Sequence, residues 1–155
     1  METGHDSRAV ANEILLIGQQ KGIPMSMMKV LKLVYFAHGW TLGITGNPLC
    51  SDPVEAWKYG PVFSNIYQSL SHNGSNDVAH LILDGEGQPI VDYNYTQYEN
   101  AIIERVIENY GHLSAFRLSD ITHEIGSPWD VTSRSFGNFS TISNELIRTY
   151  FSQKG

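Results

Sequence analysis

Three side chains able to do chemistry, Trp57, Lys58 and Tyr59, stand directly before Gly60-Pro61 in the stretch PVEAWKYGPVFSNIY. Such a block suits a reaction centre, a ligand clamp or a packed joint. In an extended segment, alternate side chains point to opposite faces, which would place Trp57 and Tyr59 on one face and Lys58 on the other. Because burying two aromatic side chains contributes on the order of several kcal/mol, the pattern favours a packed joint. The alternative is that Lys58 and Tyr59 contact a ligand or partner.

A second candidate is His123-Glu124, which begins like the zinc-binding HExxH pattern of metalloproteases. The next three residues read IGS, so the second histidine of that pattern is missing. We therefore expect no metal site and no cofactor. We interpret His123 as a structural histidine that precedes a helix break at Ser127-Pro128-Trp129.

His38 and Cys50 are a third candidate, as a base and a nucleophile. The sequence offers no third group to orient them and no set of oxyanion donors beside them. A lone cysteine also excludes an intramolecular disulfide, so we expect a buried thiol. The glycines match neither GxGxxG nor a GK[ST] ending, so no phosphate-binding loop is predicted. We expect no catalytic residues and no enzyme.

The size and composition of the chain favour one compact domain. It has 155 residues, of which 41% are hydrophobic, enough for a single core. We expect one domain over residues 1–155, with its core at about 9–151. The sequence contains no apolar run of membrane-spanning length, and its start does not resemble a secretory signal. We therefore expect a cytoplasmic protein with no membrane partner.

Charge is unevenly distributed along the chain. Residues 1–60 hold equal numbers of basic and acidic side chains, so the net charge of −6 arises after them. Between Lys58 and Arg105 there is no basic residue, while acidic residues gather over 77–99. This surface would repel a phosphate backbone, which argues against nucleic acid as the main partner and against a DNA-binding self-regulator. The acidic segment either keeps the protein soluble or forms a second contact with a partner.

The elements that position these residues are mainly helical. Residues 7–21 show a helical stripe that ends at Gly22, and Ser26 is a plausible N-cap for a helix reaching Gly46 that is apolar nearly all round. That helix is predicted to be buried at the centre, with Lys29 and Lys32 on one face and their ammonium groups in water. Further helices are predicted over 97–110, 114–126 and 142–153.

The middle of the chain is predicted to be less regular. Residues 54–57 read as a short extended segment, and Gly60-Pro61 reads as a turn feeding a helix over 61–71. Residues 72–97 read as a short hairpin or a loop. The fold class is thus mainly α, with about five to six helices around a buried central helix and minor extended elements. We expect the three tryptophans to be largely buried, with core contributions from Val34, Phe36, Leu118, Ile121 and Leu146.

Several motifs, taken in order, resemble the Panacea domain, also called the SocA-like domain. These are MKVLKLVYFAHGW, TGNPL, PVEAWKYGPV, YGHLSAFRLSDITHEIGSPW and ISNELIRTYF. The resemblance covers essentially the whole chain, from about Ala9 to Phe151. The resemblance implies an antitoxin-type module, often encoded by bacteria, phages or prophages beside a toxin gene, that neutralises a cognate toxin protein by binding it. Some relatives act as adaptors that deliver a toxin to a protease. The resemblance implies no catalysis and leaves the oligomeric state open.

Two classes of function remain after these observations. The first is a non-enzymatic interaction module, with the proteolytic adaptor as a variant of it. The second is a small-ligand-binding or enzymatic domain that uses Trp57–Tyr59 and His123–Trp129. The candidate partner-binding residues are Lys29, Lys32, Lys58 and Tyr59. The residues expected to be structural are Trp40, Trp57, Gly60, Pro61, His123 and Trp129.

Overall fold

The computed structural model describes residues 4–154. The described chain is mainly helical, as predicted, with a small three-stranded sheet. Its elements are α1 (Ser7–Lys21), α2 (Met27–Thr45), β1 (Val54–Trp57), β2 (Gly60–Val62), α3 (Ser64–Leu70), the 3-10 turn η1 (Ser71–Asn73), α4 (Gln97–Tyr110), α5 (Ala115–Thr122), α6 (Pro128–Phe136), β3 (Ser140–Ile142) and α7 (Asn144–Lys154). Within this part of the chain, no helix is both long and apolar enough to cross a membrane.

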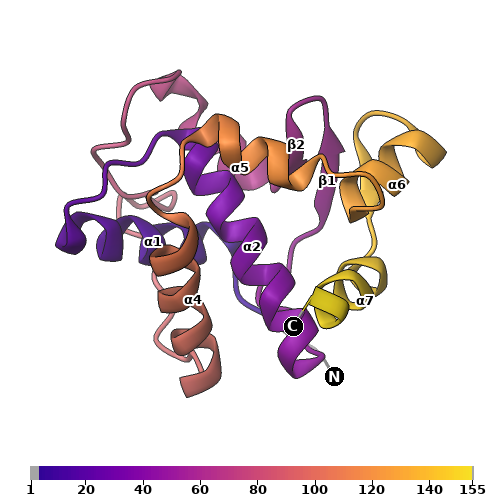
Figure 1. The fold of residues 1–155 in the computed structure, drawn as a ribbon. Coiled ribbons are helices and arrows are strands. Elements are labelled where there is room, and N and C mark those ends of the chain that lie inside the picture. Colours follow the sequence, from indigo (N-terminus) through magenta and orange to yellow (C-terminus); the bar gives the residue numbers. More distant parts are fainter. Residues whose placement is uncertain (1–3, 155) are drawn as a thin grey trace.

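Helix α2 is the centre of the fold, as its apolar surface predicted. The Ser26 side chain accepts a hydrogen bond from the Lys29 amide at its start, and Gly46 ends it in the left-handed region with φ of 81°. Helices α1, α4, α5 and α7 pack against it (Figure 1). Val34, Phe36 and Leu118 are buried in the core, while Ile121 and Leu146 pack against it half-buried. The three tryptophans are largely buried, as expected, and pack against this core.

The segment at Gly60-Pro61 corrects a prediction. Rather than starting a helix, these residues form the edge strand β2, which pairs antiparallel with β1 so that Pro61 lies opposite Ala56. An edge strand tolerates proline because its missing N–H removes no essential ladder hydrogen bond. The helix that follows begins only at Ser64.

The predicted break at Ser127-Pro128-Trp129 is present, since α5 ends at Thr122, but the same residues also start a further helix that was not predicted. The Ser127 side chain accepts a hydrogen bond from the Asp130 amide, and Pro128 occupies the first turn of α6. Proline suits that position because the first helical amides have no intrahelical partner. Helix α6 leads to β3, which adds to the far side of β1 and was also not predicted.

Residues 72–97 contain a small hairpin, one of the two alternatives left open. Leu83 and Pro89 form an isolated bridge, and the Ile90 amide donates to the Ile82 carbonyl. The buried side chain of Asn12 on α1 anchors this hairpin. Its Nδ2 donates to the carbonyls of Ile82 and Ile90, and its Oδ1 accepts a hydrogen bond from the Ile82 amide. A single buried amide thus fixes an otherwise irregular segment on α1.

Candidate partner-binding surface

The block Trp57–Pro61 is a packed joint with an exposed tip. β1 ends at Trp57, and Lys58-Tyr59 form the two-residue turn into β2. Trp57 is largely buried, whereas the Tyr59 side chain is 62% exposed. The expectation that Trp57 and Tyr59 share a face is therefore wrong, because the strand on which it rested ends at Trp57, two residues before Tyr59.

The joint brings together the two segments that the ligand-site hypothesis required. The Trp129 indole Nε1–H donates to the Trp57 carbonyl at 2.7 Å, and Ser119 Oγ donates to the Tyr59 carbonyl at 2.9 Å. The His123 ring meets the Trp129 ring edge-on, with centroids 4.0 Å apart. These contacts hold residues 57–59 and 123–129 against each other, so the indole N–H of Trp129 and the carbonyls of Trp57 and Tyr59 already have partners within the protein. The structural role predicted for Trp57, His123 and Trp129 fits this arrangement.

Lys32 lies elsewhere than predicted. Its side chain is fully buried beneath β2, and its one hydrogen bond to residues 4–154 runs from Nζ to the Pro61 carbonyl at 3.3 Å. Burial lowers the pKa of the Lys32 amine to about 7. Position 32 faces the sheet that packs on α2, so this side chain cannot reach water as a solvent-facing lysine would.

Lys29 is also less free than predicted. It is half-buried, and its Nζ donates to the carbonyl of Gly111, the C-cap of α4, at 2.8 Å. Burial lowers the pKa of Lys29, partly offset by the Asp77 carboxylate. A cation at a helix C-terminus stabilises the exposed carbonyls there. Of the four partner-binding candidates, Lys58 and Tyr59 are thus the two with exposed side chains.

The exposed tip is a compact surface, which we call the turn surface and define as Lys58, Tyr59 and Phe139. Lys58 Nζ lies 5.4 Å from the centre of the Tyr59 ring, and Lys58 makes no ion pair within residues 4–154. Phe139 is exposed, packs on Trp57 with ring centroids 5.2 Å apart, and has a φ of 68°, a conformation that aromatic residues rarely adopt. Exposed aromatic side chains beside a free cation are typical of protein-binding surfaces.

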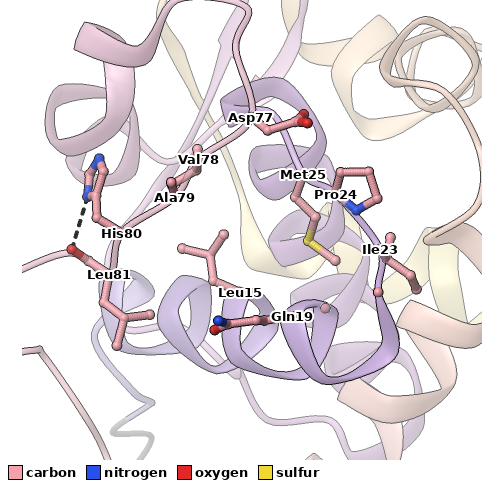
Figure 2. Close-up of a pocket in the computed structure, with 12 residues that line it drawn as sticks. Leu15, Gln19, Ile23, Pro24, Met25, Asp77, Val78, Ala79, His80 and Leu81 are labelled. Carbon is pink, nitrogen blue, oxygen red and sulfur yellow. Dashed lines mark hydrogen bonds between the residues drawn. The ribbon is translucent and has the colours of Figure 1, made fainter.

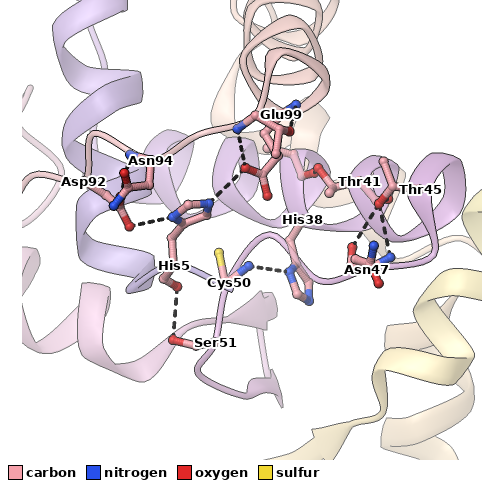
Figure 3. Close-up of polar contacts among 12 residues, drawn as sticks. His5, His38, Thr41, Thr45, Asn47, Cys50, Ser51, Asp92, Asn94 and Glu99 are labelled. Atoms are coloured by element: carbon pink, nitrogen blue, oxygen red, sulfur yellow. Dashed lines mark hydrogen bonds and ion pairs between the residues drawn. The ribbon is translucent and has the colours of Figure 1, made fainter. Parts of the chain in front are cut away.

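His38 and Cys50 do lie together, but in an arrangement that does not activate the thiol (Figure 3). The Cys50 amide donates to His38 Nδ1 at 3.1 Å, so the ring proton is on Nε2, which donates to Asn144 Oδ1 at 3.0 Å. Burial lowers the pKa of His38 to about 4, against smaller opposing effects of Asn144 and Asp52. Burial also raises the pKa of the Cys50 thiol well above its ordinary value. The pair ties α2 to the following loop and to α7.

A polar cluster that sequence reasoning missed joins the start of the chain to α4. The His5 ring lies between two carboxylates, with Nδ1 at 2.5 Å from Asp92 Oδ2 and Nε2 at 3.0 Å from Glu99 Oε1 (Figure 3). It also packs on the Tyr95 ring in a tilted arrangement, with centroids 4.3 Å apart. Burial lowers the pKa of His5, but the two carboxylates together outweigh it and leave that pKa raised. No spacing pattern could reveal this cluster, because its members lie far apart in the sequence.

Three hollows of the molecular surface have volumes between about 420 and 450 Å³, and two of them adjoin long helices. One, of about 450 Å³, lies between α1 and residues 77–81, with Leu15 and Gln19 on the helix side (Figure 2). The other, of about 420 Å³, lies between α2 and α4. Within residues 4–154, no three side chains of His, Cys, Asp or Glu gather as a metal-binding group.

Comparisons with known proteins identify relatives. Residues 30–130 match the family model described as "Antitoxin SocA-like, Panacea domain". The chain is 39% identical over 137 residues to "Antitoxin SocA" of Caulobacter vibrioides (strain NA1000 / CB15N), and the match covers 85% of this chain and 72% of that protein. No solved structure matches. The region matched by the family model contains the Lys58-Tyr59 turn and the residues that line the α2–α4 groove.

Proposed function

Since the chain belongs to the SocA-like antitoxin family with the Panacea domain, we propose that it is an antitoxin that binds and neutralises a cognate toxin protein. The observation that carries the proposal is the 39% identity to Antitoxin SocA over 85% of this chain. At that level of identity over most of a domain, the fold and the general mode of action are expected to be shared.

Neutralisation is proposed to occur by binding, without catalysis. Several of the residues that first suggested chemistry support this view, because their polar atoms are engaged in packing: the His38 ring bonds a backbone amide and Asn144, and the Trp129 indole bonds the Trp57 carbonyl. The Cys50 thiol is buried, and its raised pKa keeps it protonated. A protonated, inaccessible thiol is a poor nucleophile.

The turn surface is the proposed primary contact with the toxin. Lys58 and Tyr59 are exposed at the tip of a hairpin that is anchored on both sides, by Ser119 through the Tyr59 carbonyl and by Trp129 through the Trp57 carbonyl. A rigid support lowers the entropy lost when exposed side chains are immobilised on binding. Tyrosine is among the residue types that most often dominate binding energy, and an exposed lysine beside it can steer association.

The test is co-expression with the product of the adjacent gene. We expect that product to arrest growth alone, growth to recover when this chain is co-expressed, and the two proteins to copurify. The abundance of the toxin then separates two modes of action: an unchanged amount indicates neutralisation by binding, and loss that depends on a protease indicates delivery for degradation. Failure of the chain both to restore growth and to copurify with the toxin would reject the antitoxin proposal.

A further inference from the structure

The groove between α2 and α4 is lined almost wholly by apolar and aromatic side chains. The C-terminal part of α2 contributes Trp40 and Ile44, and α4 contributes Tyr98, Ile102 and other residues along one face. Helices α2 and α4 pack against each other, and the groove lies between them. Ile44 and Tyr98 are 62% and 64% exposed, large fractions for side chains of these types.

The polar atoms on the groove floor already have partners. The Trp40 indole Nε1–H donates to the Tyr110 hydroxyl at 3.1 Å, and the Tyr110 ring stacks on the buried Phe36 with centroids 4.3 Å apart. A ligand that covers the floor therefore leaves no indole donor without an acceptor. A ligand would gain binding free energy by removing Trp40, Ile44 and Tyr98 from water. Aromatic side chains in such pockets commonly dominate the binding energy of protein interfaces.

Among the described residues, Arg105 is the single charged side chain that lines the groove. Its ion pair with Glu108 is long, 3.9 Å, and both side chains are largely exposed, so the pair contributes little. No other basic residue lies between Lys58 and Arg117 in the sequence, and the chain carries a net charge of −6. Arg105 is thus a local exception on an acidic protein, and it is free to pair with a carboxylate of a ligand.

Shape selects the kind of occupant. A groove between two helices accepts a third helix, whose apolar stripe repeats every three to four residues and matches the ridges of the two walls. A second copy of the chain fits poorly across a two-fold axis through the groove, because the facing patch would then be the same groove lining, which contains no carboxylate for Arg105.

From these observations we propose that the α2–α4 groove docks an amphipathic helix of the cognate toxin, with apolar side chains on Trp40, Ile44 and Tyr98 and a carboxylate on Arg105. This proposal rests on the proposed antitoxin function and adds a contact separate from the turn surface. Toxin recognition then uses two surfaces: the exposed hairpin tip and a helix-binding groove.

The first test uses exposed positions, so that the fold is preserved. Ile44→Glu and Tyr98→Glu place a charge in the groove, and Ile125→Glu is the matched control, since Ile125 is 95% exposed and does not line the groove. We expect each groove variant to weaken binding of the purified toxin by about tenfold or more, and the control to stay within about twofold of the parent. Melting temperatures confirm that all three variants are folded.

The second test concerns the charge. Arg105→Glu should weaken binding, whereas Arg148→Glu, a matched exposed arginine on α7, should not. Reversal of one acidic residue on the toxin helix to lysine should then restore the affinity of the Arg105→Glu variant. If no acidic-to-lysine substitution on any helix of the toxin restores the affinity of the Arg105→Glu variant, Arg105 is not part of the interface.

The third test reads the groove directly, even if a substitution should disturb folding. The parent chain is labelled with 5-fluorotryptophan, and the fluorine signal of Trp40 is assigned with a Trp40→Phe variant. We expect that signal to shift on saturation with the toxin.

Three outcomes would contradict these proposals. A Trp40 signal that does not shift in a complex that still neutralises the toxin overturns the groove proposal and leaves the antitoxin function intact. A parent chain that neither binds nor neutralises the toxin overturns both, and a dimer of the toxin-free chain that Ile44→Glu dissociates overturns the choice of occupant.

Discussion

Gly60 lies directly over the buried amine of Lys32: a Cβ added at position 60 would stand 2.8 Å from Lys32 Nζ and 3.0 Å from Thr122 Oγ1. The glycine also has a φ of +120°, which side chains of L-residues rarely adopt. The hairpin that carries Lys58 and Tyr59 can therefore close onto α2 only because position 60 lacks a side chain.

Replacement of Gly60 by alanine or valine should destabilise the fold. Backbone strain at positive φ and the close contacts beneath it together should lower the free energy of unfolding by about 2–4 kcal/mol, as measured by urea titration. Gly22→Ala is the control, since Gly22 has a positive φ of 71° with nothing within 4 Å of an added Cβ. That control should lose only about 1 kcal/mol. Equal losses at the two positions would mean that the contact with Lys32 does not matter.

Lys32 should make stability rise with pH. Its pKa is lowered from 10.5 to about 7 on folding, so between these values the unfolded chain binds a proton that the folded chain does not. The free energy of unfolding contributed by Lys32 therefore increases as the pH rises from about 7 toward 10.5, by a few kcal/mol at most in order of magnitude.

Lys32→Met should remove this part of the pH dependence. It should also be at least as stable as the parent near neutral pH, because a buried amine is replaced by an apolar side chain of similar length. Urea titrations at about pH 7 and about pH 9.5 measure both effects, with the surface variant Lys21→Met as the control. Parent and Lys32→Met curves that change by the same amount between the two pH values would show that Lys32 does not titrate as described.

His5 should stabilise the fold in the opposite pH direction. Its pKa is raised on folding by the carboxylates of Asp92 and Glu99, so its contribution is complete below the unfolded value of 6.5 and is lost as the pH rises through the folded pKa. His5→Ala should cost about 1–3 kcal/mol at acid pH and less at alkaline pH.

Unfolding free energies at about pH 6 and about pH 9 check this prediction, with the exposed His72→Ala as the control. Amide hydrogen exchange over residues 92–99 should also accelerate in the His5→Ala variant, since His5 ties that segment to the start of the chain. A cost that is independent of pH would mean that His5 acts by packing on Tyr95 rather than by its charge.

Lys58→Glu tests the turn surface. Because Lys58 is exposed and without an ion pair in the described chain, the substitution should change stability by less than about 0.5 kcal/mol. Toxin association should slow, and the difference from the parent should shrink as salt concentration rises. Arg148→Glu, on α7 outside the region matched by the family model, provides a control of equal charge change. Unchanged affinity and neutralisation in Lys58→Glu would exclude this lysine from the interface.

The sequence alone determined the features that depend on neighbours along the chain. The first two helices and their ends follow from Ser26, Gly22 and Gly46, because caps and glycine turns act within a few residues. The apolar surface of residues 27–45 likewise predicted a buried central helix, since a helix without a polar face must be covered on all sides. The order of the family motifs predicted the membership that the comparisons show.

Only the tertiary structure decided what depends on segments that are distant in sequence. Lys32 and Lys58 look alike as residues, yet β2 covers one and leaves the other in water. Pro61 lies in a strand because β1 pairs with its segment. His5 contacts the carboxylates of Asp92 and Glu99, which are about 90 positions away in the sequence. Whether a charge is buried, a strand is paired or a groove stays open depends on contacts between segments that are distant in sequence. Local helix and strand propensities do not encode those contacts.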